Sequence, residues 1–433
     1  MKSISVVTLG CKVNQYDTAA ILNRLPESKY KTVPFPEKAD IYVIDTCTVT
    51  HKADSEARRC ISRARRSNPE GIVIVTGCYA QVSSDEVKEI EGVDYVIGNS
   101  HKFSSLLKAI REGQAQNEPK LFISDIFKEK KKSFETPGIE RFPGRTRAFL
   151  KVQDGCNYAC TFCIIPRARG RSRSLEIDEI IKRMETLADA GYKEIVLTGV
   201  HIASYGRDIG TTFPELIRRI DDARVVGRVR LTSLDPADMD ESFVRQIAAS
   251  ETICPQFHVA LQSGDANILK RMRRRYAPER FLEMTDLIRE TMPDAAIGSD
   301  IMVGFPGETD EEFANTCETA GKSALTYFHV FPYSRRRETP AAAMPDQVRP
   351  DIIRERSKAL RAIGVRKKKE FYSTFIGKTL PVLVESGNTG TTHNYISVRI
   401  TGGDFKVGDE ALMTITGLDG EEALAAPIRE ARN

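Results

Sequence analysis

Three cysteines are spaced C-x-x-x-C-x-x-C within the stretch QDGCNYACTFC, at Cys156, Cys160 and Cys163. Soft thiolates of this kind select zinc, copper(I) or iron–sulfur clusters. A structural zinc site needs a fourth Cys or His, and none stands close by in the sequence. Three thiolates that hold a [4Fe–4S] cluster leave one iron open to a ligand such as S-adenosylmethionine (SAM). The spacing therefore predicts a SAM-binding cluster at these cysteines, here called the loop site, with zinc as the alternative.

Three other cysteines lie far apart in the sequence but follow the same kind of element. Cys11, Cys47 and Cys78 each come just after an apolar, strand-like run and just before a helical pattern. The carboxyl ends of parallel strands lie along one edge of a sheet, which is where ligands bind. A lone cysteine is more often a small buried hydrophobe. Three cysteines at matching places predict a second three-cysteine cluster, here called the edge site.

The nine cysteines of the chain are not expected to form a disulfide framework. The first ten residues lack the basic and apolar regions of a secretory signal, and no apolar run approaches the ~20 residues that cross a bilayer. We therefore expect a cytoplasmic protein without membrane contact, in a reducing compartment where thiols stay free. The remaining cysteines, Cys60, Cys254 and Cys317, are expected to be structural.

A chain of 433 residues is too long for one ordinary core, and its elements change character along its length. Strand-like runs alternate with helical patterns through an expected first domain, residues 1–113, which predicts a parallel sheet with right-handed crossovers. The strand-like runs are 4–8, 41–45, 72–76 and 95–97. Residues 114–141, rich in Lys, Glu, Pro and Gly, are expected to be a linker.

The alternation starts again in an expected second domain, residues 142–372, and gives six strand-like runs separated by helical patterns. The runs are 149–152, 194–197, 229–232, 257–261, 297–303 and 327–331. Six such units predict an open or partial (β/α) barrel, whose chemistry lies at the carboxyl ends of its strands. The loop site follows the first of these strands directly.

The last segment, residues 373–433, follows a basic helical pattern at 351–372. Its short strand-like runs, 380–385, 395–400 and 410–415, are separated by turns rich in Gly, Asn and Asp. This pattern predicts a small antiparallel β-barrel. The expected fold class is thus α/β, with a parallel α/β domain, a partial barrel and a small β-barrel in sequence.

Charge is balanced over the whole chain but concentrated in places. The formal net charge is only +4, and 41% hydrophobic with 29% charged residues is typical of a globular protein rather than a disordered or membrane one. Most basic runs are solvated faces, but several on one chain favour a polyanionic partner, because each neutralised phosphate releases counterions. The runs include residues 167–173, 271–275, 335–337 and 366–369.

Taken together, these motifs resemble the radical-SAM methylthiotransferase family over nearly the whole chain. The resemblance rests on TLGCKVNQYD from Thr8, GCNYACTFCIIP from Gly155, FHVALQSG from Phe257 and SDIMVGFPGET from Ser299. It implies an N-terminal three-cysteine domain, a radical-SAM barrel and a C-terminal TRAM domain that binds RNA.

The residues around Cys11, LGCKVN, are most similar to the MtaB branch of that family. This branch installs a methylthio group at C2 of N6-threonylcarbamoyladenosine, next to the anticodon of tRNA. The isopentenyladenosine branch usually has QMN after the first cysteine, and the branch acting on a ribosomal protein has PKN. The chain departs from the family at Glu338, where relatives often have glycine, and this puts the local turn in doubt.

The resemblance implies SAM and two [4Fe–4S] clusters as cofactors. Cys156, Cys160 and Cys163 would hold the cluster that binds and cleaves SAM, giving a radical that removes hydrogen from adenine C2. Cys11, Cys47 and Cys78 would hold the other cluster, whose open iron presents the sulfur. A second SAM would methylate that sulfur, while an electron donor such as flavodoxin or ferredoxin and a sulfur source would be needed as partners.

Other site residues follow from their positions. Polar and small residues near strand ends, expected to contact SAM or else to cap loops, are Thr198, Gly199, Gln262 and Asp300. Arg167 and Arg169, just after the loop site, are expected either to pair with a phosphate or the substrate carboxylate or to be solvated. Lys367, Lys368 and Lys369 are expected to bind the tRNA backbone.

Three rival hypotheses remain open from the sequence. One is an RNA-binding protein whose clusters do no catalysis, and another is a radical-SAM enzyme that modifies a ribosomal protein. The third is a zinc protein.

Overall fold

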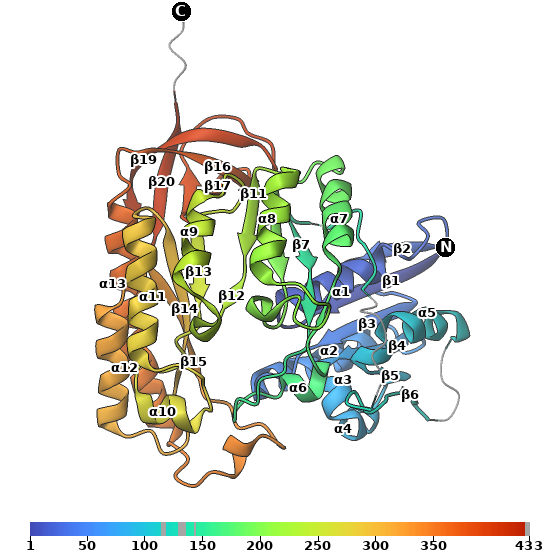
Figure 1. Cartoon of the computed structure of the whole chain (residues 1–433). Helices are drawn as coiled ribbons and strands as arrows, with labels where there is room; N and C mark the ends of the chain where they lie inside the picture. Colours follow the sequence, from blue (N-terminus) through green and yellow to red (C-terminus); the bar gives the residue numbers. More distant parts are fainter. Residues whose placement is uncertain (114–117, 129–135, 143, 429–433) are drawn as a thin grey trace, which may run out of the picture.

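The computed structural model describes residues 1–113, 118–128, 136–142 and 144–428. The chain forms an N-terminal α/β part, a central barrel of parallel strands and a small C-terminal β-barrel (Figure 1). The small barrel covers the amino-terminal ends of the central strands, and the N-terminal part lies beside them (Figure 1). None of the described helices is both long and apolar enough to cross a membrane.

The N-terminal part is built on a six-stranded parallel sheet of order β2-β1-β3-β4-β5-β6. Its strands are β1 (Lys2–Thr8), β2 (Tyr30–Val33), β3 (Ile41–Thr46), β4 (Ile72–Gly77), β5 (Tyr95–Ile97) and β6 (Lys120–Phe122). Every residue of β3 and β4 is buried, because helices cover both faces of the sheet. The helices are α1 (Lys12–Leu22), α2 (His51–Ser67), α3 (Cys78–Val82), α4 (Ser84–Lys88) and α5 (Lys102–Glu112).

The four strands expected from the sequence are present, and two edge strands were missed. β2 and β6 are short and carry few buried residues, so they lack the apolar run that reveals an inner strand. β6 lies within the expected linker and pairs with β5 at the edge of the sheet. Of that linker, residues 114–117 and 129–135 lie outside the described residues.

The central barrel contains the six expected parallel strands in an open arrangement. They form two sheets of order β11-β10-β7 and β12-β13-β14-β15, joined by a bridge between Val229 and Ile253. The strands are β7 (Arg147–Lys151), β10 (Glu194–Thr198), β11 (Arg228–Leu231) continued by β12 (Ser233–Leu234), β13 (Gln256–Val259), β14 (Ala296–Val303) and β15 (Tyr327–Pro332). β7 and β15 are the two edges, so the barrel is open between them.

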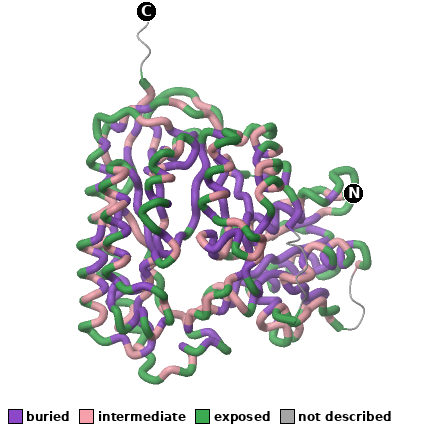
Figure 2. Tube along the Cα trace, in the orientation of Figure 1, coloured by how far each residue is buried: buried purple, intermediate pink, exposed green. Residues whose placement is uncertain are grey.

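Helices enclose the barrel strands, which form a largely buried interior (Figure 2). The main ones are α7 (Ile177–Asp189), α8 (Phe213–Ala223), α9 (Glu241–Ala249), α11 (Pro278–Thr291), α12 (Asp310–Lys322) and α13 (Pro350–Ser373). The open side is flanked by α1, which packs on β7, and by α13, which packs along β15. Tyr16, Ala19 and Ala20 of α1 belong to the same apolar core as Phe149 of β7.

The C-terminal barrel closes with the order β16-β17-β18-β20-β19. Its strands are β16 (Thr379–Ser386), β17 (Thr389–Thr392), β18 (Ser397–Ile400), β19 (Glu410–Asp419) and β20 (Glu422–Pro427). The expected small barrel is confirmed, although β18 and β20 pair in parallel. β17 and β20 were missed because Thr, Gly and Ala, rather than large apolar residues, fill them.

Candidate functional site

The loop site is held by backbone contacts within the central barrel. Gly155 has φ +73°, and a side chain there would come within 2.1 Å of the Arg171 carbonyl oxygen, so only glycine fits this turn. Cys156 N donates to the Gly170 carbonyl at 3.0 Å. Thr161 donates through its backbone N to Met272 O at 3.1 Å and through its hydroxyl to Arg271 O at 2.9 Å. The start and the middle of the cysteine loop are therefore held by the barrel.

Two cationic side chains lie beside the loop-site thiols. Arg274 Nη1 is 3.4 Å from Cys160 Sγ, and its guanidinium also pairs with Asp235. His201 lies against Cys156 and Asp238, with its Nε2 3.0 Å from Asp238 Oδ2. Although burial alone would lower it, these neighbours raise the pKa of His201 to about 9. Burial raises the pKa of Cys160, and the positive charge of Arg274 opposes that rise.

The edge site is assembled by three adjacent strand ends. Cys11 follows β1, Cys47 follows β3 and Cys78 begins α3 directly after β4, and these strands are neighbours in the sheet. Gly10 has φ +98°, and a side chain there would lie 2.6 Å from Cys47 Cβ and 2.8 Å from its Sγ. The Cys11 loop therefore packs directly on Cys47.

Two side chains tie the three loops of the edge site together. Asn14 Nδ2 donates to Leu9 O at 2.8 Å and to Thr46 O at 3.0 Å, which joins the Cys11 and Cys47 loops. Thr46 Oγ1 donates to Thr76 O at 2.5 Å, which joins the Cys47 and Cys78 loops. The expectation that these distant positions meet at one sheet edge thus agrees with the topology.

Burial changes the acidity of the thiols at both sites. It raises the pKa of Cys47 to about 12, helped by the neighbouring Cys78 and Cys11, and it raises the pKa of Cys163 to about 12. It also raises the pKa of Cys78, against the charge of Arg169. Without a cationic ligand these thiols stay protonated, so loading metal must release protons.

The residues of both sites fit iron–sulfur clusters by their chemistry. Each site offers three soft sulfur donors from convergent loops. Among the residues that the structure describes, no three His, Cys, Asp or Glu side chains lie close enough to surround a single metal ion. A four-iron cluster is a larger body than one ion, so its cysteine ligands stand farther apart.

One short helix, α6 (Ile165–Arg169), runs from the loop site to the edge site. It begins two residues after Cys163, and its last residue, Arg169, faces Cys78 and Cys11. Asn99 links the two sides, because its Nδ2 lies 3.7 Å from Cys78 Sγ and donates to Ala168 O at 2.8 Å. Five residues of helix span about 8 Å, so a short helix connects the region of the loop site to that of the edge site.

A buried ionic network joins the N-terminal part to the barrel beside α6. Arg169, 1% exposed, pairs with Asp154 at 3.0 Å and with Asp17 at 3.4 Å. Asp17 also pairs with Lys102 at 3.2 Å and with Lys151. Burial opposes charge on Asp17, but the three cations hold the pKa of its carboxyl below the usual range.

A cavity of about 340 Å³ lies inside the barrel, next to the edge site. It is lined by strand residues from β7 round to β15, by Lys12 and Gln15 of α1, and by Tyr395 of the small barrel. Lys12 directly follows Cys11, so one end of the cavity adjoins the edge site. The volume is in the range of small-ligand sites.

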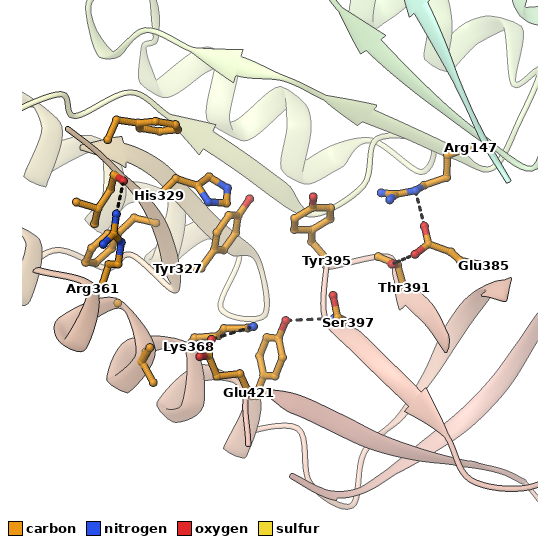
Figure 3. Close-up of a pocket in the computed structure, with 16 residues that line it drawn as sticks. Arg147, Tyr327, His329, Arg361, Lys368, Glu385, Thr391, Tyr395, Ser397 and Glu421 are labelled. Atoms are coloured by element: carbon orange, nitrogen blue, oxygen red, sulfur yellow. Dashed lines mark hydrogen bonds and ion pairs between the residues drawn. The ribbon is translucent and has the colours of Figure 1, made fainter. Parts of the chain in front are cut away.

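A second, larger groove of about 650 Å³ leads to this cavity. It runs between β15, α13 and the small barrel, and it shares Arg147, Tyr327, His329 and Tyr395 with the inner cavity (Figure 3). Aromatic rings follow one another along it, with centroids 6.3 Å apart for Phe331 and His329, 5.9 Å for His329 and Tyr327, and 5.6 Å for Tyr327 and Tyr395. Such rings are stacking platforms for bases.

The residues expected to contact SAM lie at different depths of the barrel. Thr198 ends β10 and is buried, whereas Asp300 is in the middle of β14, faces the cavity and pairs with His258 at 3.2 Å. Gly199 is needed for close packing, since a side chain there would meet Gln153 Oε1 at 2.8 Å. Gln262 adopts φ +62°, a strained conformation for a residue with a side chain.

The basic residues expected at the substrate are already engaged to different degrees. Arg169 is buried in the network above, so a contact with substrate would require that network to open. Arg167 pairs with Glu338 at 2.6 Å on the surface. Lys367 donates to Ser323 O at 2.8 Å, which turns its ammonium inward. Lys368 lines the groove and lies 3.5 Å from Glu421, and Lys369 is exposed.

The turn at Glu338 keeps the backbone that a glycine would give, with φ +65°. It follows Arg336, which is buried and donates to Asp54 at 2.6 Å and to Thr48 Oγ1 at 2.7 Å, beside the edge-site Cys47. The departure at Glu338 therefore leaves the local turn intact.

Several residues at the sites were not identified from the sequence. His201 and Arg274 touch the loop site, Asn99 touches the edge site and Lys12 lines the cavity. Arg274 belongs to a basic run, and His201 stands three residues after a strand end. Neither pattern distinguishes a residue at a site from a solvated one.

Two family models match this chain. Residues 150–320 match the model described as "Radical SAM superfamily". Residues 3–98, which contain the edge-site cysteines, match one described as "Uncharacterized protein family UPF0004".

Curated relatives cover nearly the full length. The "Threonylcarbamoyladenosine tRNA methylthiotransferase MtaB" of Aquifex aeolicus is 40% identical over 92% of this chain and 97% of its own. The protein of the same name from Bacillus subtilis is 40% identical over 94% and 92%. The "tRNA-2-methylthio-N(6)-dimethylallyladenosine synthase" of Acetivibrio thermocellus is 33% identical over 95% and 86%.

Solved structures share the fold. The radical SAM methyltransferase TsrM from Kitasatospora setae, solved with tryptophan and a SAM analogue, superposes with a TM-score of 0.56 at 17% identity. The match covers 79% of this chain and 75% of TsrM. At this identity the likeness concerns the fold alone.

Proposed function

Because this chain belongs to the radical-SAM methylthiotransferase family, and within it to the MtaB branch, we propose that it adds a methylthio group to C2 of N6-threonylcarbamoyladenosine next to the anticodon of tRNA. The observation that carries the proposal is the pair of three-cysteine sites at the two ends of α6. One reaction needs both sites, since hydrogen must leave C2 and sulfur must arrive there.

The cofactors are SAM and two [4Fe–4S] clusters. In our proposal Cys156, Cys160 and Cys163 hold the cluster that binds SAM, and Cys11, Cys47 and Cys78 hold the other. When bound, these groups supply radical cleavage of SAM on one side and the transferred sulfur on the other. Arg274 and His201 offset the negative charge of the loop-site thiolates, and Asn99 orients Cys78. Thr198, Gly199, Gln262 and Asp300 remain our candidates for SAM contacts.

The groove beside β15 supports a nucleotide substrate. Its rings offer stacking for bases unpaired from the anticodon loop, and the inner cavity is large enough for one base that is turned out. We propose that the small barrel is a TRAM domain and that it binds the tRNA backbone together with Lys368 and Lys369. Contacts of this kind position an RNA without reading its sequence.

The proposed reaction sets the remaining partners. An electron donor such as flavodoxin or ferredoxin would reduce the loop-site cluster, and a sulfur source would restore what each turnover consumes. The tRNA substrate places the enzyme in the cytoplasm.

Anaerobic reconstitution tests this function. Purified protein loaded with both clusters is given SAM, a reductant and anticodon stem-loop RNA that carries threonylcarbamoyladenosine, dimethylallyladenosine or plain adenosine. We expect a methylthio product with the first RNA only. Product from the dimethylallyl RNA instead would move the chain to the other tRNA branch. If no RNA is modified while an isolated ribosomal protein is, the substrate class is wrong.

A further inference from the structure

Several polar side-chain atoms that line the inner cavity have no hydrogen-bond partner among the described residues, which is unexpected for a pocket that holds an apolar group. Gln256 is 3% exposed, and one end of its amide donates to Tyr327 Oη at 3.0 Å while the other end has no partner among the described residues. The Thr232 hydroxyl and the Gln15 amide oxygen also line the cavity without a partner there. A buried polar atom left unpaired costs stability, so these atoms indicate a polar ligand.

Four cations line the same cavity, and they fall into two pairs. Arg147 lies 2.7 Å from Glu385, and Arg230 lies 2.7 Å from Glu194, so protein carboxylates balance these two. Lys12 and Arg145 make no ion pair with any described residue. The acidic residue that shares the cavity, Asp300, is paired with His258.

The two cations without an ion pair, Lys12 and Arg145, are well placed to meet an anion. Lys12 is exposed, and it lines the cavity. Arg147 and Arg230 repel Lys12. Asp300 and Cys11 attract it less strongly, so an anionic ligand would relieve the remaining repulsion. Arg145 stacks on Phe149, with its guanidinium carbon 5.3 Å from the ring centroid, which holds it at the cavity wall.

We propose that this cavity binds the N6 side chain of the substrate nucleoside, with Lys12 and Arg145 pairing with its carboxylate. This proposal rests on the proposed function. A threonylcarbamoyl group offers one carboxylate, one hydroxyl and two urea N–H groups, which match two free cations and the unpaired Gln256, Thr232 and Gln15 side chains. A dimethylallyl group offers none of these and would leave the Gln256, Thr232 and Gln15 atoms without a hydrogen-bond partner.

The test compares the natural acid with its neutral carboxamide, each built into an anticodon stem-loop RNA. Holoenzyme is assayed for kcat and KM of methylthiolation. We expect wild type to prefer the acid by roughly 10- to 100-fold, the range of a hydrogen-bonded buried charge. Lys12→Gln should remove most of this preference through the KM of the acid, and Lys12→Arg should restore it. Arg145→Gln should act in the same direction.

Lys31→Gln on β2, an exposed lysine that does not line the cavity, is the matched control and should keep the full preference. Iron content is measured for each variant, because Lys12 adjoins Cys11. Equal loss of acid and carboxamide activity in Lys12→Gln would overturn the carboxylate role, as would a wild type that does not distinguish the two RNAs. A wild type that methylthiolates neither RNA would overturn the proposed function itself, and the subsite with it.

Discussion

The loop site and the edge site each present three thiols, but they are assembled in opposite ways. The loop site lies in one continuous stretch that is anchored at Gly155 and Thr161 to the barrel that contains it. The edge site exists only when β1, β3 and β4 pair and their loops meet. A local motif needs one turn of backbone, whereas the assembled one needs the whole N-terminal sheet. Substitutions that disturb packing should therefore impair the edge site more than the loop site.

The two sites also differ in what connects them to the rest of the molecule. The edge site faces the barrel across α6 and the ionic network around Asp17 and Arg169. Its relation to the loop site therefore depends on a domain junction as well as on its own ligands.

The largest expected effect distinguishes the roles of the two sites in SAM cleavage and in methylthiolation. Cys160→Ala should abolish both SAM cleavage and methylthiolation, because we propose that SAM binds at the loop site. Cys47→Ala should abolish methylthiolation but leave SAM cleavage partly intact. Chromatography of 5′-deoxyadenosine and of the modified nucleoside measures both.

Cys60→Ala is the matched control, a buried cysteine of α2 outside both sites, and should keep both activities. Methylthiolation by Cys47→Ala would remove the edge site from the mechanism.

The second effect tests whether the edge site depends on close packing. Gly10→Ala should force the new methyl group into Cys47 and remove the edge-site share of the iron. Gly113→Ala has a similar φ, +86°, but no atom within 4 Å of the new methyl group, so it should cost only about 1 kcal/mol and keep all the iron. Iron and sulfide analysis of the two proteins decides. Full iron in Gly10→Ala would show that the Cys11 loop is free to move.

The third effect tests the junction. Asp17→Asn leaves Lys102, Lys151 and Arg169 with one carboxylate fewer in a buried place, which should lower the free energy of unfolding by about 3–5 kcal/mol. Denaturant unfolding measures this loss. Glu215→Gln, which breaks a surface pair with Arg218 on α8, should change little. Equal effects for the two variants would mean that the network does not hold the junction.

The smallest effect concerns the junction between the central barrel and the small barrel. Burial would raise the pKa of Glu194, but Arg230, Arg228 and Arg147 outweigh it and lower the pKa from 4.5 to about 2. Because the folded pKa is depressed, the stabilisation is complete above pH 4.5 and is lost as pH falls toward 2. It amounts to about 3 kcal/mol.

The variant Glu194→Gln should flatten the acid limb of the stability–pH curve and leave the iron content unchanged. Iron loss in this variant would contradict the separation between the small barrel and the cysteine sites.

Much of this architecture was predictable because buried parallel strands have long apolar runs. Such runs identified β3, β4 and the six barrel strands, and with them the strand ends that bear the cysteines. β2, β6, β17 and β20 lacked that signal, since edge strands and strands of small residues owe their structure to their neighbours.

The site was predictable only where its chemistry has a sequence pattern. Cysteine spacing and position indicated both cysteine sites. The proposed role of Lys12 depends on the other cations of the cavity being paired with protein carboxylates. The position of His201 depends on its loop folding back to Cys156. Contacts of this kind arise from the tertiary fold and have no pattern in the neighbouring sequence.

The most direct test of the account is nucleoside mass spectrometry of tRNA from cells that lack this gene and are complemented with wild type, Cys47→Ala or Cys160→Ala. The account predicts that threonylcarbamoyladenosine persists without its methylthio group in all but the wild-type complement. Loss of the methylthio group from an isopentenyl nucleoside instead would contradict the assigned branch. An unchanged set of nucleosides would contradict the central claim that tRNA is the substrate.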